Sequence, residues 1–381
     1  MNIVADENMP LAEEIFSETG TVKRVPGRTL CADDLAGADM LLVRSVTQVN
    51  PALLKGTDLR FVGTATIGTD HVDTEYLARQ HIPFSSAPGC NADAVVEYVL
   101  SSLFHLAQSQ GFDPRTRTYG IVGVGNVGSR LHQRLKALGY QVLLNDPLRA
   151  AAGEEGFVEL DELLAEADVV CLHTPLTKSG VSPSYHLLDE ARLEKLKPGV
   201  ILLNAGRGPV IDNRALLKVK QQRDDLTLVL DVWEHEPVVD PALVALTEIA
   251  TPHIAGYSYD GKIRGTFMLY EACCHALGLP VTQRLDDFLP DPEINEVRVT
   301  SDVSALALIR LRYDPYSDDR ALRHGLHLSA EARAVAFDQL RKHYARRREY
   351  RSLTIRGTLS GTQKQQLSAI GFQIAGDVDI I

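Results

Sequence analysis

A glycine-rich turn between a strand-like and a helix-like segment constrains the fold of this chain more than any other feature. The apolar residues Tyr119–Val122 lead directly into Gly123-Val-Gly125-Asn-Val-Gly128, and helical spacing follows over Ser129–Leu138. In such a turn the first glycine permits the tight bend, the second lets the backbone approach a pyrophosphate, and the third lets helix and strand pack closely. The helix N-terminus then faces the phosphates. The pattern predicts a parallel α/β domain that binds a dinucleotide.

An acidic residue stands at the end of the next expected strand. This strand covers Gln141–Asp146, and Asp146 lies 18 residues beyond Gly128. A carboxylate at this position accepts hydrogen bonds from the adenosine ribose and repels the 2′-phosphate of NADP. Asp146 therefore predicts NAD as the cofactor, although Arg149 nearby is a cation of the kind that accommodates a 2′-phosphate.

Strand-like and helix-like segments alternate along most of the chain, which predicts βαβ units and mainly parallel sheets. Two series of strands are expected, with a helix over Ala92–Gln108 between them. The first series comprises Ile3–Ala5, Met40–Arg44, Phe61–Thr64 and Ile82–Ser85, and the second comprises Tyr119–Gly123, Gln141–Asp146, Val169–His173, Val200–Asn204, Thr227–Leu230 and Glu248–Ala250. We therefore expect two Rossmann-like or flavodoxin-like lobes, each a parallel sheet flanked by helices.

A second long helix and a proline-rich stretch define the expected domain boundaries. The helix over Lys262–Leu277 is expected to return the chain to the first lobe, and Pro290-Asp-Pro292 then marks a boundary. The expected domains are a discontinuous substrate domain (1–91 and 256–285), an NAD-binding Rossmann domain (92–255) and a C-terminal α+β domain (286–381). The last is expected to contain a strand at 296–300, helices at 303–311 and 330–347, and then a strand, a helix and a strand between 353 and 380.

Composition excludes several classes of partner. The chain has 39 Lys and Arg against 50 Asp and Glu, a formal net charge of −11, which opposes general nucleic-acid binding. The basic run Arg341–Arg351 lies on an expected amphipathic helix, so we interpret it as a surface that faces solvent or a dimer partner. The five cysteines lack the spacing of a metal or disulfide framework, so no metal is expected. With no leader-like or membrane-spanning segment in view, we expect a cytoplasmic protein without a membrane partner.

Three polar residues follow expected strands of the second lobe, where ligands bind in open α/β sheets. They are Arg207 in LLNAGRGPV, Glu236 in DVWEHEP and His253 in TPHIAG. Removing a hydride from a hydroxyl-bearing carbon requires a base for the hydroxyl proton, and histidine titrates in the right range. A carboxylate can orient the ring, and an arginine can hold a substrate carboxylate in a planar fork. The sequence predicts His253 as the acid–base residue, Glu236 as its partner and Arg207 as the substrate anchor.

These motifs together resemble the D-isomer-specific 2-hydroxyacid dehydrogenases over about residues 1–280. The resemblance implies a split catalytic lobe with the NAD lobe inserted, and a homodimer. It also implies that Asp231 meets the nicotinamide carboxamide. The cofactor contacts implied by the resemblance and the glycine turn are Gly123, Gly125, Asn126, Val127, Gly128, Asp146, Thr174, Ala205, Gly206, Arg207, Asp231 and Gly256.

Other segments resemble one branch of this family. They are LLVRSVTQVN, GTATIGTDHVD and IAGYSYDGKIRGT, together with the additional C-terminal residues. This resemblance implies oxidation of 4-phospho-D-erythronate to 3-hydroxy-2-oxo-4-phosphooxybutanoate in pyridoxal 5′-phosphate biosynthesis, and a C-terminal domain that dimerises. Ser45, Thr66 and Tyr257 would contact this phosphorylated hydroxy acid, and Arg44, which precedes Ser45, is a cation that could bind one of its anionic groups.

Two alternative functions stay open at this point. A 3-phosphoglycerate dehydrogenase also acts on a phosphorylated hydroxy acid and can carry a regulatory α+β unit at its C-terminus. A non-catalytic NAD-sensing co-regulator is the alternative from a different class. The presence of Arg207, Glu236 and His253 argues against lost catalysis.

Overall fold

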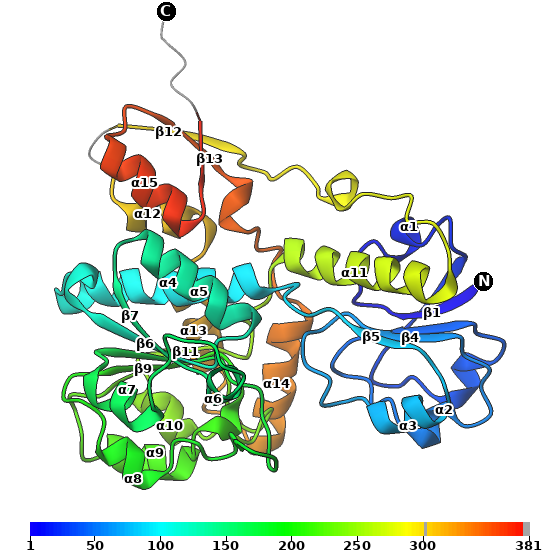
Figure 1. Cartoon of the computed structure of the whole chain (residues 1–381), viewed down its shortest axis with the longest axis horizontal. Helices are drawn as coiled ribbons and strands as arrows, with labels where there is room; N and C mark the ends of the chain where they lie inside the picture. Colours follow the sequence, from blue (N-terminus) through cyan, green and yellow to red (C-terminus); the bar gives the residue numbers. More distant parts are fainter. Residues whose placement is uncertain (301–302, 376–381) are drawn as a thin grey trace, which may run out of the picture. The chain divides into compact units, whose positions relative to one another are not determined.

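The computed structural model describes residues 1–300 and 303–375 and divides into two compact units. The first unit comprises Met1–Ala92 and Ser258–Asp291, and the second comprises Asp93–Tyr257 and Pro292–Ile381. Three sheets are present in the described residues, and all their strand pairs are parallel, as the alternating pattern predicts (Figure 1). None of the helices in this described part is both long and apolar enough to cross a membrane.

The first unit is built on a five-stranded sheet in the order β2-β1-β3-β4-β5, the flavodoxin-like order. Its elements are β1 (Asn2–Asp6), α1 (Ala12–Ile15), β2 (Thr21–Val25), β3 (Met40–Val43), α2 (Pro51–Leu54), β4 (Phe61–Thr64), α3 (Thr74–Arg79), β5 (Phe84–Ser86) and α11 (Tyr259–Leu277). Helix α11 covers one face and α2 and α3 cover the other (Figure 1). Because side chains alternate along a strand, Ile3 and Ala5 pack toward α11 while Val4 packs on the opposite face.

The return of the chain to this unit through α11 confirms the prediction made for Lys262–Leu277. Ile263, Phe267 and Tyr270 are buried against β1, β3 and β4. Strand β2, in contrast, was not expected from the sequence. It lies at the sheet edge, and only Val25 in its sequence TVKRV is fully buried, so the strand lacks a clear apolar pattern.

The second unit contains a six-stranded sheet in the order β11-β10-β9-β8-β6-β7. Its strands are β6 (Thr118–Val122), β7 (Gln141–Asn145), β8 (Val169–Leu172), β9 (Ile201–Asn204), β10 (Thr227–Leu230) and β11 (Ile249–Ala250). Its helices up to Tyr257 are α4 (Ala92–Gln110), α5 (Asn126–Ala137), α6 (Pro147–Ala151), α7 (Leu160–Glu166), α8 (Glu190–Glu194), α9 (Asn213–Lys220) and α10 (Pro241–Leu246). The strand order changes direction at β6, and a parallel sheet binds ligands at such a switch point.

The C-terminal residues form a small α+β arrangement within the second unit. Its elements are β12 (Glu296–Val299), α12 (Ala305–Arg312), α13 (Pro315–His324), α14 (Ala330–Lys342), β13 (Thr354–Gly357), α15 (Gly361–Ile370) and β14 (Gln373–Ile374). Short 3₁₀ helices span Ala32–Leu35, Pro114–Thr116, Gly208–Val210, Leu285–Phe288 and Tyr350–Ser352 along the chain. The three strands pair in the order β12-β13-β14. Together the three sheets and their helices confirm the expected α/β fold with an additional α+β part.

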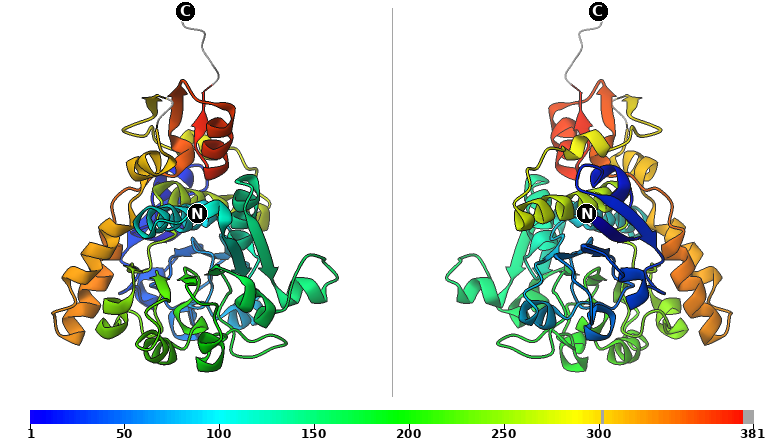
Figure 2. Two further views of the ribbon diagram at one scale, coloured as in Figure 1. Left: turned by 90° about the vertical axis from the view of Figure 1, so that its left-hand side faces the viewer. Right: turned by 90° about the vertical axis from the view of Figure 1, so that its right-hand side faces the viewer.

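This C-terminal part shares one hydrophobic core with α4 and the six-stranded sheet. Tyr350, Ile355 and Phe372 belong to the same buried cluster as Tyr98 and Leu103 of α4. Helix α15 lies beside α5, where Arg134 Nη1 donates to the carbonyls of Ser368 and Ala369 at 3.3 Å (Figure 1). Figure 2 shows α14, coloured orange, along the outer side of the same unit. The separate dimerisation domain at 286–381 stays a prediction.

The helix expected over 330–347 ends earlier than the sequence suggested, at Lys342. Arg347 is only 6% exposed, and its guanidinium carbon lies 4.2 Å from the centre of the Tyr313 ring. Its Nη2 donates to the carbonyls of Ala94 and Ala255, both at 2.7 Å. The basic run was interpreted as a helical surface that faces solvent or a partner. This interpretation is wrong at Arg347, which is buried and joins α4 to the loop after His253 by hydrogen bonds. Helix α13 was also unexpected, and residues 376–380 of the last expected strand lie outside the described residues.

Candidate active site

The glycine turn adopts the backbone that its sequence predicts. Gly123 has φ of 86°, and a Cβ there would lie 2.8 Å from the Thr174 nitrogen. A Cβ on Gly128 would lie 2.1 Å from the Gly123 carbonyl oxygen, so this glycine lets α5 pack on β6. Gly125, at the N-cap of α5, faces open space within 4 Å. The first and third glycines thus make the close contacts, and the second leaves room for a ligand beside the backbone.

Asp146 lies directly beside this turn. Its Oδ2 accepts a hydrogen bond from the Val124 N–H at 2.9 Å, and its Oδ1 caps α6 by accepting from the Arg149 N–H at 3.2 Å. Arg149 Nη1 donates to the Val124 carbonyl at 2.8 Å, while its Nε and Nη2 pair with Glu154. The cation that could favour a 2′-phosphate is thus engaged by a carboxylate, while Asp146 stands at the turn where a ribose is expected.

The end of β8 lies directly beside the glycine turn. A Cβ on Gly206 would lie 3.2 Å from the Thr174 carbonyl oxygen, and Gly123 approaches Thr174 from the other side. Thr174 Oγ1 and both ring nitrogens of His173 are buried without a hydrogen-bond partner among the described residues. Burial lowers the pKa of His173 to about 4, so the ring is neutral near pH 7. Buried polar atoms without partners beside an open glycine turn fit a polar ligand such as a dinucleotide.

The predicted acid–base pair is formed. His253 Nδ1 lies 2.7 Å from Glu236 Oε2, and Glu236 Oε1 accepts a hydrogen bond from the Trp233 N–H at 2.8 Å. Glu236 follows β10 and His253 follows β11, so neighbouring parallel strands deliver the two side chains to one edge of the sheet. Because Nδ1 faces the carboxylate, Nε2 is the ring nitrogen placed to exchange a proton with a substrate.

Electrostatics keeps Glu236 ionised despite its surroundings. Burial alone would raise the pKa of Glu236, but the charge of His253 and the hydrogen bonds from His253 and Trp233 hold it below its usual range. The charge of Arg341 acts in the same direction. An ionised Glu236 stabilises the protonated form of the imidazole, which suits a histidine that accepts a proton during catalysis.

The loop that carries His253 is fixed by Asp231, which is 1% exposed. Asp231 Oδ1 accepts from the Ile254 N–H at 2.8 Å and Oδ2 from the Ala255 N–H at 2.9 Å. The Thr251 hydroxyl also donates to Oδ1. These bonds hold His253 at φ of 56°, a left-handed conformation that is uncommon for residues other than glycine. Asp231 therefore shapes the loop that carries His253, and its expected contact with the nicotinamide stays a prediction.

Arg207 follows β9, the strand next to β10, and its Nη1 donates to the Gly206 carbonyl at 2.9 Å. The neighbouring Gly208 explains how two functional loops come together. A Cβ on Gly208 would lie 2.0 Å from the Trp233 carbonyl carbon, so only glycine permits this approach of the Arg207 loop to the loop that carries Glu236. The structure thus places all three predicted catalytic residues at adjacent strand ends of the second unit.

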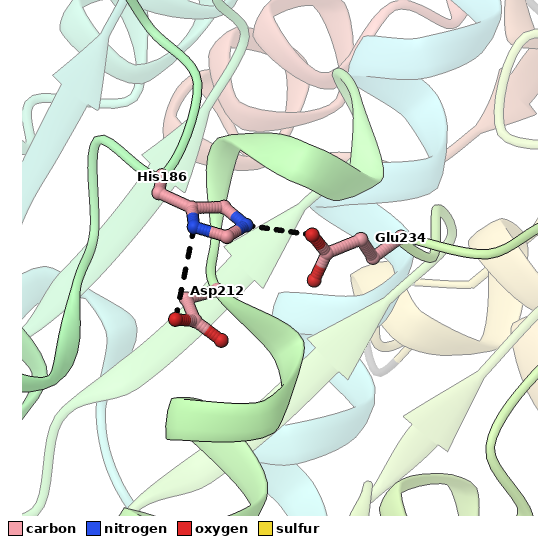
Figure 3. A group of neighbouring side chains, drawn as sticks. All are labelled: His186, Asp212 and Glu234. Carbon is pink, nitrogen blue, oxygen red and sulfur yellow. Dashed lines mark hydrogen bonds and ion pairs between the residues drawn. The ribbon is translucent and has the colours of Figure 1, made fainter.

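A group of three potential metal ligands lies near these loops, although the sequence predicted no metal. Figure 3 shows His186 between Asp212 and Glu234, with ligand atoms within 4.8 Å of one another. His186 Nε2 lies 2.6 Å from Glu234 Oε1, and Nδ1 lies 3.7 Å from Asp212 Oδ2. Glu234 Oε2 also accepts from the Asn213 N–H at 3.1 Å. These contacts join the loop that carries His186 to the loop of Glu236, and they account for the arrangement without an ion.

The predicted substrate residues are divided between the units. Arg44 and Ser45 follow β3, and Thr66 follows β4, so the first unit presents them at adjacent strand ends. The Thr66 hydroxyl donates to the Gly68 carbonyl at 2.8 Å and lies 2.7 Å from the Thr64 hydroxyl. Tyr257 belongs to the second unit, where its ring makes an edge contact with Tyr344 at 5.7 Å between centroids.

Sequence reasoning missed the C-terminal residues that adjoin the catalytic loops. Arg341 lies over the Tyr257 ring at 5.6 Å, and Arg347 binds the Ala255 carbonyl two residues after His253. The Tyr344 hydroxyl, next to Tyr257, donates to Asp318 at 2.8 Å. No local signal marks these residues, because a run of arginines has the same appearance in sequence whether it is exposed or buried.

Comparison with known proteins identifies the family. Residues 97–255 match the model described as "D-isomer specific 2-hydroxyacid dehydrogenase, NAD binding domain", and residues 288–371 match one described as a domain of unknown function. The chain is 52% identical over 360 residues to the erythronate-4-phosphate dehydrogenase of Ectopseudomonas mendocina, covering 93% of this chain and 95% of the relative. Identity to the enzyme of the same name from Azotobacter vinelandii is 50% over 378 residues, covering 97% and 99%.

A solved structure extends the likeness to the fold. The D-lactate dehydrogenase of Aquifex aeolicus, solved in complex with NAD and lactic acid, superposes with a TM-score of 0.59 and 25% identity, over 73% of this chain and 96% of that chain. The curated relatives, in contrast, match this chain over nearly its full length. The chain belongs to the erythronate-4-phosphate dehydrogenases, within the D-isomer-specific 2-hydroxyacid dehydrogenase family.

Proposed function

We propose that this chain oxidises the 2-hydroxyl of 4-phospho-D-erythronate with NAD, giving 3-hydroxy-2-oxo-4-phosphooxybutanoate for pyridoxal 5′-phosphate biosynthesis. The observation that carries the proposal is the 2.7 Å pair of His253 and Glu236 in the same unit as the glycine turn. The names of near full-length relatives support this substrate. Bound NAD supplies the acceptor for the hydride that leaves C2.

His253 removes the hydroxyl proton in this scheme. Nε2 accepts the proton while Nδ1–H donates to Glu236, so the imidazolium forms next to an ionised carboxylate. The C2–H bond supplies the hydride and the O–H bond supplies the proton, so a ketone, NADH and a proton are the products. In the reverse direction the protonated His253 acts as the acid.

The remaining site residues in this scheme bind and orient the substrate and the cofactor. Arg207 offers a guanidinium fork to the substrate carboxylate and to the oxygen on C2, where negative charge develops. The glycine turn, Asp146 and Thr174 would hold the cofactor, supported by the open face of Gly125 and the buried hydroxyl of Thr174. Arg44, Ser45, Thr66 and Tyr257 are proposed substrate contacts, and their cation and hydroxyl groups suit a phosphorylated acid.

A homodimer in the cytoplasm is part of the same proposal. An apolar groove of about 550 Å³ between α13 and α14, lined by Leu322, Leu326 and Leu340 among others, leaves C-terminal surface for a partner. Cys273 and Cys274 are adjacent, buried free thiols, which suits a reducing compartment. Sedimentation of the full chain at low micromolar concentration tests the dimer.

The activity is tested by following NADH formation with 4-phospho-D-erythronate and with 3-phosphoglycerate. We expect the higher kcat/KM with 4-phospho-D-erythronate. The opposite preference would favour the phosphoglycerate enzyme, and NAD binding without turnover of any hydroxy acid would favour a co-regulator. Glu236→Gln should retain NAD binding and shift the pH–rate profile, because the imidazolium loses its carboxylate; an unchanged profile would remove Glu236 from the pair.

A further inference from the structure

The end of α14 places a cation next to the proposed substrate tyrosine. The Arg341 guanidinium lies 5.6 Å from the centre of the Tyr257 ring and 5.9 Å from that of Phe337. Its neighbours Lys342 and His343 are exposed, whereas Arg341 is half-buried. Unlike these exposed neighbours, Arg341 points toward the loop that follows His253.

Arg341 carries a hydrogen-bond donor that lacks an acceptor. Its Nε is buried, and no acceptor in residues 1–300 and 303–375 lies within hydrogen-bond distance of it. An unpaired buried donor is costly, and more so when the group is charged. A ligand that brings an anionic oxygen to this position would remove the cost.

The charge of Arg341 is maintained in this setting. Burial alone would lower the pKa of Arg341, but the Tyr257 phenol, the Glu236 carboxylate and Asp338 hold it above its ordinary value. The Arg341 guanidinium therefore stays positively charged at neutral pH. Since it also lowers the pKa of Glu236, it lies within electrostatic reach of the catalytic pair.

We propose that Arg341 binds the phosphate group of the substrate, so that the C-terminal part supplies a specificity-determining residue to the catalytic unit. This inference rests on the proposed function. Arg207 already offers a fork for the carboxylate and Arg44 is one proposed cation for the substrate, and a phosphate with close to two negative charges can engage a further cation. The guanidinium lies over the Tyr257 ring, and its Nε–H, which has no partner among the described residues, is a charged donor that a phosphate oxygen can accept.

The test compares two substrates in the full-length protein with NAD. Arg341→Met keeps a long apolar side chain over Tyr257 and removes the donors. For 4-phospho-D-erythronate we expect KM to rise about 10- to 100-fold, the value of one or two charge-assisted hydrogen bonds. For D-erythronate, which lacks the phosphate, kcat/KM should be almost unchanged. The inhibition constant of inorganic phosphate against 4-phospho-D-erythronate should rise with the KM.

Lys342→Met is the matched control, since it removes the same charge from an exposed neighbour and should leave both substrates unaffected. Equal losses with both substrates would overturn the inference and make Arg341 a positioning residue that acts through Glu236. An unchanged KM would also overturn it. If Arg341→Met does not fold, Arg341→Lys decides, because a single ammonium should raise the KM several-fold for the phosphorylated substrate alone. Failure of the unmodified protein to oxidise 4-phospho-D-erythronate would instead contradict the proposed function.

Discussion

The glycine turn and the C-terminal segment around Arg341 and Arg347 both belong to the second unit, but only the turn is visible in the sequence. The turn needs particular backbone conformations and close approaches, such as φ of 86° at Gly123, and few residues other than glycine satisfy them. Arg341 and Arg347 take their roles from distant partners, Tyr257 and the carbonyls of Ala94 and Ala255. Functional residues that meet backbone requirements are therefore recognisable from spacing, whereas those defined by tertiary partners are not.

Removing the second of these regions should have the largest effect. A chain that ends at Leu289 loses the apolar residues that pack on Tyr98 and Leu103, so we expect loss of measurable activity and exposure of the α4 face. Sedimentation and NADH formation measure the outcome. A chain that ends at Ala375 keeps every described C-terminal residue and should stay active. An active truncated protein that remains dimeric would show that the C-terminal part is a regulatory module.

His253→Ala tests a residue that, like the glycine turn, was recognised from the sequence. We expect kcat to fall about 10²- to 10⁴-fold, the usual contribution of a positioned acid–base group. NAD binding, followed by the fluorescence of Trp233, should change little. The exposed neighbour in the same motif provides the control, and His235→Ala should retain the rate of the unmodified protein. A normal kcat in His253→Ala would remove this residue from the mechanism.

Asp146→Ser sharpens the assignment of the cofactor. Serine retains the capacity to cap α6 but lacks the second oxygen that accepts from the Val124 N–H, so the fold should persist and the main change should be in cofactor use. The KM for NAD should rise about 10-fold or more as the charged hydrogen bonds to the ribose are lost, and the preference over NADP should relax. Initial rates with both cofactors measure this. Equal use of NAD and NADP by the unmodified protein would show that Asp146 does not select the cofactor.

Glu97→Gln probes the contact between α4 and the C-terminal segment, and its expected effect is the smallest. Burial and the nearby Glu349 raise the pKa of Glu97, whose Oε1 accepts from the Tyr350 N–H at 2.6 Å. Because the pKa of Glu97 is higher in the folded state, there is a pH range in which folded Glu97 holds a proton that unfolded Glu97 has lost. Stability from this group is therefore complete below the unfolded pKa near 4.3 and declines as pH rises toward the folded pKa.

A glutamine amide at this position does not titrate, so Glu97→Gln should flatten this decline and be the more stable of the two proteins at alkaline pH. Denaturant unfolding at several pH values measures the difference. Glu155→Gln, at an exposed position, is the control and should leave the slope unchanged. A steeper loss of stability in the Glu97→Gln protein with rising pH would contradict the assignment of the bound proton to Glu97.

The sequence was sufficient for those parts of the molecule whose local pattern is strong. The strands of the second unit alternate with helices and are continuously apolar, and they were placed correctly, as were the loops of Glu236 and His253 that they support. Strand β2 was missed because an edge strand such as TVKRV buries few side chains. The end of α14 was misplaced because helical spacing continues into 343–347, while tertiary contacts of Arg347 stop the helix.

The positive φ of His253 has a consequence for how the protein can be improved. A residue with a Cβ in the left-handed region costs about 1–2 kcal/mol, whereas glycine adopts φ of 56° without this cost. The side chain that we propose exchanges the proton is therefore not the one that would make this loop most stable. Selection for heat resistance alone would favour an inactive protein at this position, so engineering for robustness should leave His253 fixed and begin elsewhere.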